Sequence, residues 1–189
     1  MPPAPSHLSR ASRVYLAGFM GSGKSTIGPI LANAIGYSFI DLDSVIESQT
    51  GCTIEELFRK EGEEKFRERE RSALRSASKS SLLVIALGGG ALTDAASLAI
   101  VRETGIVVYL RVPLDELIGR LHGRHGRPLL TTEKGEALSP QALRERVTAL
   151  FAARESIYMQ SEVIVETEGR TVGLTVDHIV KKLSAYLPQ

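Results

Sequence analysis

The sequence has few of the features that mark membrane-spanning, disulfide-stabilised or polyanion-binding proteins. Its single cysteine, Cys52, excludes an intramolecular disulfide and fits a reducing compartment, although such a chain could also be exported. The longest apolar run, Leu82 to Leu87, is far shorter than the roughly 18 residues needed to span a bilayer. The 23 basic and 22 acidic residues give a formal charge of +1, which provides no overall field for nucleic acid or a membrane surface. We expect a cytoplasmic protein without nucleic-acid or membrane partners.

Length and composition predict a single folded domain. At roughly 150 residues per domain, 189 residues with 43% hydrophobic and 24% charged side chains are typical of one soluble globular unit. Residues 1–12 are rich in proline and serine and lack the apolar region of a signal peptide. They are predicted to form a disordered leader, and residues 13–189 the domain.

Short apolar runs alternate with longer stretches of helical period. This alternation is typical of βαβ units, whose parallel strands are buried on both faces and therefore read as continuous apolar runs. The predicted fold class is α/β, a three-layer α/β/α arrangement around a central parallel five-stranded sheet. The expected strands are VYLAG (14–18), YSFIDLD (37–43), LLVIAL (82–87), IVVYLRV (106–112) and EVIVET (162–167).

Two segments depart from this regular alternation. Residues 55–75 hold seven acidic and seven basic side chains and are spaced as a charged helix whose only gap is Gly62. Residues 120–134 carry a basic surplus and cannot form one continuous helix, because three helix breakers interrupt them: Gly123, Gly126 and Pro128. This second segment is predicted to be a mobile basic lid.

Residues 18–25, GFMGSGKS, match the phosphate-loop pattern G-x-x-x-x-G-K-[ST] between an apolar strand and a helical pattern. Gly21 and Gly23 allow backbone N–H groups to turn inward on phosphate oxygens, and the following helix adds the positive end of its dipole. Lys24 is expected to bridge the β- and γ-phosphates and Ser25 to ligate Mg²⁺. The motif predicts a nucleoside-triphosphate site.

Two other interpretations of this loop are weaker. The first is a glycine turn that carries a Lys-Ser pair by chance. The second is a dinucleotide-binding loop, since Asp41 and Asp43 lie about 20 residues downstream, where a ribose-binding acid is expected. The third glycine of that fingerprint is Thr26 here, and a Lys-Ser pair has no purpose in it.

Asp41 and Asp43 alternate around Leu42 at the end of the second predicted strand. Both carboxylates are therefore expected to project to one side at the carboxyl edge of the sheet, where doubly wound folds bind ligands. Such a pair can hold Mg²⁺, accept a proton from a substrate hydroxyl, or cap the following helix. Their position beside a phosphate loop favours chemistry.

Charged side chains occur at positions where the helical period predicts a buried residue. Phe66, Glu70 and Leu74 share one stripe, and Arg67 lies within reach of Glu70. This pair is either a structural ion pair or a device in which Glu70 holds Arg67 for an anionic substrate. Arg154 likewise continues a buried seam in the helix that starts at 139–140, so it requires a carboxylate or phosphate partner, either substrate or structural.

The third predicted strand runs directly into Gly88, Gly89 and Gly90. Many phosphate-loop enzymes place a magnesium-binding aspartate at this point, and none is present here. The metal must then draw on Ser25 and, we infer, Asp41. The glycine run either allows a ligand to lie against bare backbone N–H groups or is a flexible turn.

Together these motifs resemble the shikimate kinase family, within the nucleoside-monophosphate-kinase-like group of phosphate-loop enzymes. The resemblance covers the chain from Arg13 to Leu187. The phosphate loop alone is widely shared, but its combination with the other motifs is specific. In order they are GFMGSGKST (18–26), DLD (41–43), FRERE (66–70), LGGGA (87–91), RPLL (127–130) and the R-x-x-x-Y of Arg154 and Tyr158.

The resemblance implies transfer of the γ-phosphoryl group of ATP to the 3-hydroxyl of shikimate, a step toward chorismate and the aromatic amino acids. The implied catalytic residues are Asp43, Lys24 and Arg127. The implied shikimate-binding residues are Asp43, Arg67, Glu70, Gly88, Gly89, Gly90 and Arg154. The implied ATP-binding residues are Gly21, Ser22, Gly23, Lys24, Ser25, Thr26, Arg120, Arg127 and Arg170, with Ser25 and Asp41 serving Mg²⁺.

Two other functions remain as alternatives. One is a kinase of another small polyol acid such as gluconate, and the other is a kinase-like binding protein without catalysis. Relatives of the first kind lack the combination of the glycine run with Arg67 and Arg154. The chain is expected to act as a monomer.

Overall fold

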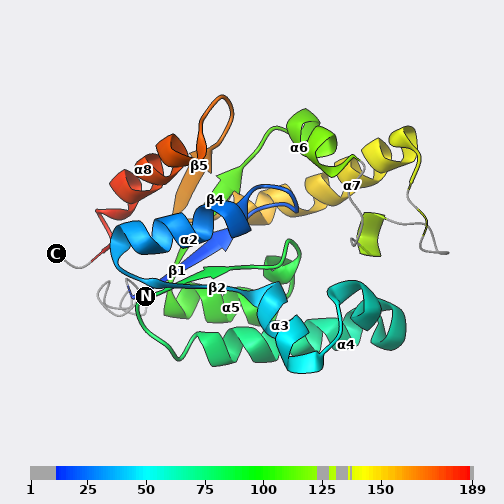
Figure 1. Cartoon of the computed structure of the whole chain (residues 1–189), viewed down its shortest axis with the longest axis horizontal. Helices are drawn as coiled ribbons and strands as arrows, with labels where there is room; N and C mark the ends of the chain where they lie inside the picture. Colours follow the sequence, from blue (N-terminus) through cyan, green and yellow to red (C-terminus); the bar gives the residue numbers. More distant parts are fainter. Residues whose placement is uncertain (1–11, 123–127, 131–135, 137, 188–189) are drawn as a thin grey trace, which may run out of the picture.

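Five parallel strands form a single sheet in the order β2-β3-β1-β4-β5 (Figure 1). The computed structural model describes residues 12–122, 128–130, 136 and 138–187. All four strand pairings are parallel, as the apolar runs predict. The strands are β1 (Arg13–Ala17), β2 (Ser38–Asp41), β3 (Leu83–Ala86), β4 (Ile106–Arg111) and β5 (Val163–Glu166).

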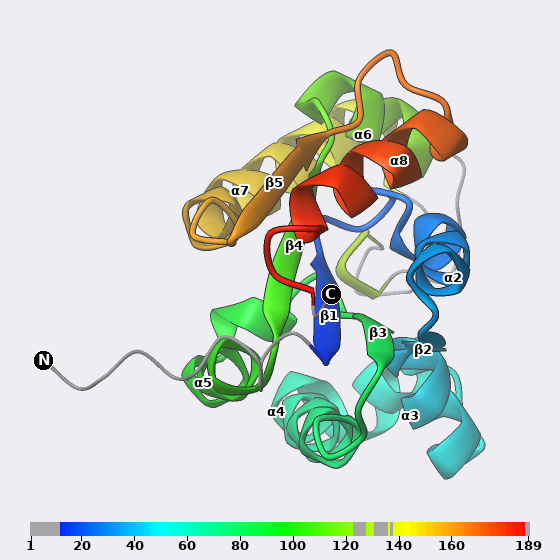
Figure 2. The same cartoon turned by 90° about the vertical axis from the view of Figure 1, so that its left-hand side faces the viewer.

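Helices cover both faces of the sheet (Figure 2). Along β1, Val14 and Leu16 pack with α2 and α8, whereas Tyr15 and Ala17 pack with α3, α4 and α5 on the opposite face. This alternation is the period-2 side-chain pattern of a strand buried on both faces. The helices are α2 (Lys24–Ile35), α3 (Leu42–Thr50), α4 (Ile54–Ala77), α5 (Ala95–Thr104), α6 (Leu114–Leu121), α7 (Pro140–Tyr158) and α8 (Val172–Leu183), with 3₁₀ turns at Ala91–Thr93 and Pro128–Leu130.

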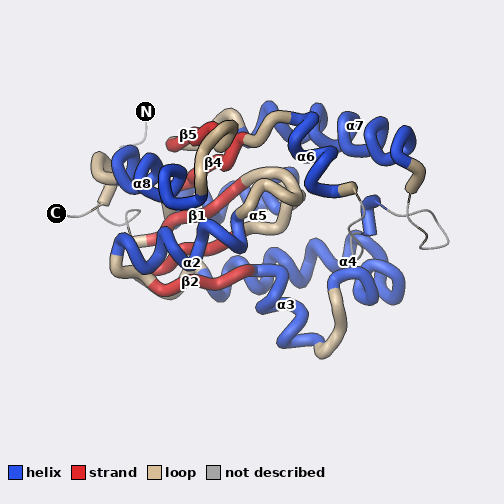
Figure 3. Tube along the Cα trace, turned by 45° about the horizontal axis from the view of Figure 1, so that its top comes forward, coloured by secondary structure: helices blue, strands red, loops and turns tan. Residues whose placement is uncertain are grey.

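A third apolar cluster lies beyond the carboxyl end of β1. Phe19 and Met20 of the loop after β1 pack there against α6, α7 and the 3₁₀ turn Pro128–Leu130. Figure 3 shows α3 and α4 on the β2 side of the molecule and α6 and α7 on the β4–β5 side. The loop after β1 is therefore anchored against α6 and α7 at the edge of the sheet where a ligand site is expected.

The charged segment forms α4, and its gap at Gly62 is a kink. Gly62 has φ 83° and ψ 171°, which no helical residue adopts. Thr53 caps the helix in a reciprocal capping box with Glu56. Arg69 donates two hydrogen bonds of 2.8 Å to Glu61 across the kink. The predicted buried stripe of Phe66, Glu70 and Leu74 is confirmed.

One predicted element ends earlier than expected. The strand predicted over residues 37–43 stops at Asp41, and α3 begins at Leu42. Asp41 Oδ1 accepts a hydrogen bond from the Asp43 N–H at 3.1 Å, so the aspartate caps a helix at the point where the strand pattern would continue. In the predicted lid, residues 123–127 and 131–134 lie outside the described part of the structure. No described helix is long and apolar enough to cross a membrane.

Candidate active site

The phosphate loop lies between β1 and α2, as its motif requires. Gly18, Gly21 and Gly23 have φ values of 148°, 82° and 95°, a backbone region that side chains with a Cβ disfavour. In the described structure, the N–H groups of Gly21, Gly23 and Ser25 donate no hydrogen bond. The first N–H groups of a helix have no partner within it, so this loop offers donors suited to an anion.

The ammonium group of Lys24 lies along the inside of this loop. Its Nζ donates to the carbonyl oxygens of Gly18 at 2.8 Å and Phe19 at 3.1 Å, and to Ser22 Oγ at 3.4 Å. The loop therefore carries a full positive charge beside its backbone donors.

The two aspartates meet the loop from different elements. Ser25 Oγ donates to Asp41 Oδ2 at 2.6 Å, which joins the start of α2 to the end of β2. The expectation that Asp41 and Asp43 project from one strand is wrong, because Asp43 lies in the first turn of α3. The helix turn nevertheless brings both carboxylates to the same cavity.

A cavity of about 410 Å³ opens over the phosphate loop. It brings together most of the residues predicted to bind the nucleotide and metal, namely Gly21, Ser22, Gly23, Lys24, Ser25, Thr26, Asp41, Arg120 and Arg170. Arg120 is fixed at its mouth, donating to the Gly21 carbonyl at 3.0 Å and to Glu116 at 2.6 Å. Sequence reasoning did not assign six further lining residues, namely Met20, Ile27, Leu87, Thr167, Val172 and Thr175. Arg127 lies outside the described residues.

A second, smaller cavity of about 60 Å³ adjoins the first. It is lined by every residue predicted to bind the acid substrate, namely Asp43, Arg67, Glu70, Gly88, Gly89, Gly90 and Arg154. Apolar walls that sequence reasoning did not assign come from Ile54, Phe58 and Leu129. Met20, Asp43 and Gly89 line both cavities, so these three residues mark the junction.

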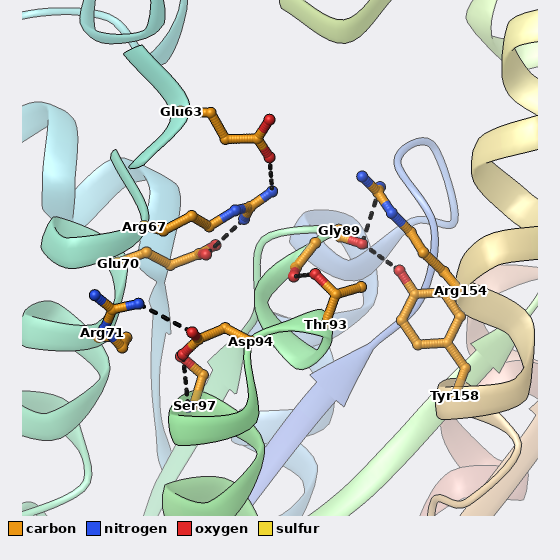
Figure 4. Close-up of polar contacts among 11 residues, drawn as sticks. Glu63, Arg67, Glu70, Arg71, Gly89, Thr93, Asp94, Ser97, Arg154 and Tyr158 are labelled. Carbon is orange, nitrogen blue, oxygen red and sulfur yellow. Dashed lines mark hydrogen bonds and ion pairs between the residues drawn. The ribbon is translucent and has the colours of Figure 1, made fainter. Parts of the chain in front are cut away.

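Arg67 and Glu70 form a close ion pair in the wall of the smaller cavity (Figure 4). Arg67 Nη1 lies 2.6 Å from Glu70 Oε2, and its Nη2 lies 3.1 Å from Glu63 Oε1. The Arg67 guanidinium rests directly on the Cα of Gly90, where any side chain would collide with it. Gly90 is thus needed for this close approach.

The second carboxylate oxygen of Glu70 is buried without a hydrogen-bond partner among the described residues. The Glu70 side chain is 1% exposed, and this oxygen lies against Gly88, near Asp43 Oδ1. Burial raises the pKa of Glu70, opposed by Arg67 and reinforced by the carboxylates of Asp43 and Asp94. Glu70 thus both holds Arg67 and places a second carboxyl group beside Asp43.

Arg154 reaches the smaller cavity from α7, on the side opposite Arg67 (Figure 4). The residue is only 6% exposed, as its place in the buried seam predicts. Its Nη1 donates to the Gly89 carbonyl at 3.1 Å, and its guanidinium lies 5.7 Å from the centre of the Phe19 ring. Two arginines thus face each other across the glycine run, an arrangement suited to a small carboxylate.

The fold and the loop cavity define a phosphate-loop kinase, with a second cavity lined by two arginines beside the phosphate loop. Comparison with known proteins gives the family. A model of the shikimate kinase family matches residues 20–184. The shikimate kinase of Chlorobium chlorochromatii is 41% identical over 176 residues, covering 93% of each chain. The crystal structure titled shikimate kinase from Acinetobacter baumannii in complex with shikimate superposes with a TM-score of 0.84 at 33% identity, covering 94% of this chain and 95% of the other.

This chain belongs to the shikimate kinase family, whose members are kinases that transfer a phosphoryl group to an alcohol group. A gluconokinase from Sinorhizobium meliloti is a more distant structural neighbour, with a TM-score of 0.53 at 19% identity. That likeness shows a shared fold alone. The family match therefore favours a shikimate kinase over a gluconate kinase.

Proposed function

We propose that this chain transfers the γ-phosphoryl group of ATP to the 3-hydroxyl of shikimate, giving shikimate 3-phosphate and ADP. The observation that carries the proposal is the position of Asp43, which lines both the cavity over the phosphate loop and the smaller cavity between the two arginines. A group at this junction touches the acceptor hydroxyl at the point where the phosphoryl group arrives. The family match supports the choice of substrate.

The nucleotide is assigned to the larger cavity. The unpaired N–H groups of the phosphate loop bind the phosphates, and Lys24 exchanges the loop carbonyls for the β- and γ-phosphate oxygens. Arg120 and Arg170, which line the same cavity, are assigned to the adenine end. Arg127 is assigned to the phosphates on the resemblance alone.

Ser25 and Asp41 are assigned to Mg²⁺. Their side-chain oxygens lie 2.6 Å apart beside the phosphate loop, and oxygen donors of this kind are those that Mg²⁺ prefers. Magnesium commonly takes one or two protein ligands and completes its shell with phosphate oxygens and waters, so this small donor set fits. When bound, the ion neutralises charge on the phosphate oxygens.

The acid substrate is assigned to the smaller cavity. Arg67 and Arg154 bind its carboxylate together with the backbone of the glycine run, and Asp43 binds its ring hydroxyls. The 3-hydroxyl oxygen attacks the γ-phosphorus, the bond from that phosphorus to the β,γ-bridging oxygen breaks, and Asp43 accepts the hydroxyl proton. Catalysis in this scheme consists of positioning and charge stabilisation.

The test is product identification. Protein, ATP, Mg²⁺ and shikimate are incubated, ADP is measured, and phosphorus–proton correlation NMR locates the new phosphate on the ring. We expect ADP and shikimate 3-phosphate in equal amounts. Phosphate on another hydroxyl would contradict the assigned orientation, and shikimate-independent ADP release alone would contradict the transfer.

We further infer that the chain acts as a monomer in the cytoplasm. The described residues assigned to the nucleotide and to the acid substrate line two adjoining cavities within a single chain. Light scattering on a sizing column is expected to give a mass near 20.5 kDa. A dimer mass would contradict the monomer.

A further inference from the structure

The Gly89 carbonyl, at the junction of the two cavities, is held by two donors from α7. Arg154 Nη1 donates to it at 3.1 Å, and the Tyr158 hydroxyl donates to the same oxygen (Figure 4). A carbonyl oxygen has two lone pairs, so these donors fill its capacity. The Tyr158 side chain is 2% exposed, and burial raises its pKa so that the hydroxyl keeps its proton and remains a donor.

Fixing this carbonyl also fixes the N–H of the next residue. The two groups share one planar trans peptide and point in opposite directions. With the Gly89 carbonyl turned to α7, the Gly90 N–H is aimed away from α7. Arg67 and Arg154 lie on opposite sides of Gly89 (Figure 4). In the described structure no hydrogen bond uses the Gly89 or Gly90 N–H, and both residues line the smaller cavity.

A second buried tyrosine lies against Tyr158 and offers a matched comparison. Tyr109 of β4 stacks on Tyr158 with ring centres 5.0 Å apart and an interplanar angle of 30°. Its hydroxyl is also buried, yet has no hydrogen-bond partner among the described residues. Of these two adjacent buried tyrosines, only Tyr158 has a hydroxyl that contacts the glycine run in the described structure.

We propose that Tyr158 is a positioning residue for the carboxylate of the acid substrate. Its hydroxyl and Arg154 hold one carbonyl, so that the Gly90 N–H and the Arg154 guanidinium face the carboxylate as a single fixed unit. The proposal rests on the proposed function, because that function places a carboxylate in the smaller cavity. Without the hydroxyl, Arg154 alone fixes the Gly89 peptide, and both groups gain freedom that binding must remove.

The experiment compares Tyr158→Phe with the control Tyr109→Phe. The control also removes a buried tyrosine hydroxyl, but one that has no hydrogen-bond partner among the described residues. For Tyr158→Phe we expect the KM and the dissociation constant for shikimate to rise about five- to tenfold, as for the loss of one buried hydrogen bond. The KM for ATP stays within about twofold, because the phosphate loop is untouched. Tyr109→Phe leaves both constants unchanged.

A shikimate analogue whose carboxylate is replaced by a carboxamide separates positioning from general loosening. The wild type is expected to prefer the carboxylate, and Tyr158→Phe to show that preference reduced by about the same five- to tenfold factor. Equal weakening of both ligands, or wild-type binding by Tyr158→Phe, would overturn the proposal. Absence of shikimate-dependent turnover in the wild type would instead overturn the proposed function.

If Tyr158→Phe does not fold, the wild-type protein supplies the test. In ¹⁵N NMR, the Gly90 amide proton is expected to move downfield on titration with shikimate and much less with the carboxamide. An unchanged Gly90 amide in the shikimate complex would overturn the proposal.

Discussion

Asp43 is the residue on which the proposed chemistry depends most. It reaches the junction of the two cavities from the first turn of α3, and Asp41 holds its backbone N–H there. We expect Asp43→Asn to fold normally and to lose about 100-fold or more in kcat, because proton acceptance is removed while the shape is kept. Coupled ADP release and thermal unfolding measure the two effects. Glu68→Gln, at an exposed position of α4, is the control, and near-normal turnover of Asp43→Asn would reduce Asp43 to a structural residue.

Glu70 gives a prediction about pH. Burial raises its pKa above the ordinary 4.5, so the unfolded chain ionises first as the pH rises. Glu70 therefore makes its largest contribution to the free energy of unfolding below pH 4.5. This contribution decreases as the pH rises from there through the pKa that Glu70 has in the folded protein. In Glu70→Gln the amide oxygen can still accept a hydrogen bond from Arg67, and the side chain at position 70 no longer titrates. Urea unfolding from pH 4 upward should show wild-type stability falling relative to the variant, and parallel curves would contradict this.

At the scale of elements, the kink in α4 shapes the smaller cavity. Ile54 and Phe58 before the kink and Phe66, Arg67 and Glu70 after it line the same space. A straight helix could not turn both halves toward it, and the positive φ of Gly62 allows the bend.

Substitution of Gly62 tests the kink. Gly62→Ala places a Cβ at φ 83°, at a cost of about 1–3 kcal/mol in stability, and we expect the KM for shikimate to rise more than that for ATP. The control is Gly119→Ala in α6, an exposed helical glycine, where alanine should stabilise by about 0.5–1 kcal/mol. Thermal unfolding and two-substrate kinetics measure both variants. Equal stability changes in the two variants would contradict the role of the kink.

The elements themselves were largely predictable, because strands buried on both faces must be apolar throughout and the phosphate loop fixes where one helix starts. The boundary at Asp41 was not predictable in this way. Its carboxylate caps α3, and this local hydrogen bond outweighs the strand pattern of the following two residues. The periodicity of α4 and α7 found the buried Glu70 and Arg154, since a charge within an apolar stripe stands out.

For the whole molecule, the distribution of charge is more informative than the net charge, because the net charge does not show where the cations gather. A formal charge of +1 excludes no anionic ligand once Lys24, Arg67, Arg120 and Arg154 line two adjoining cavities. Lys24, Arg67 and Arg154 came from separate motifs in the sequence and Arg120 from the family resemblance, and only the fold shows that they meet. Phe58 and Leu129 were not assigned to the smaller cavity, and Tyr158 entered only as part of a motif, because an apolar or aromatic residue at helical spacing looks the same whether it faces a core or a cavity.

The most direct measurement of function is the rate of ADP release with ATP, Mg²⁺ and a panel of small polyol acids that includes shikimate and gluconate. Shikimate is expected to give the highest kcat/KM by a wide margin, because the two facing arginines and the glycine run form a pocket for one small carboxylate. Shikimate-dependent ADP release no higher than background, or a higher kcat/KM with gluconate, would contradict the assignment.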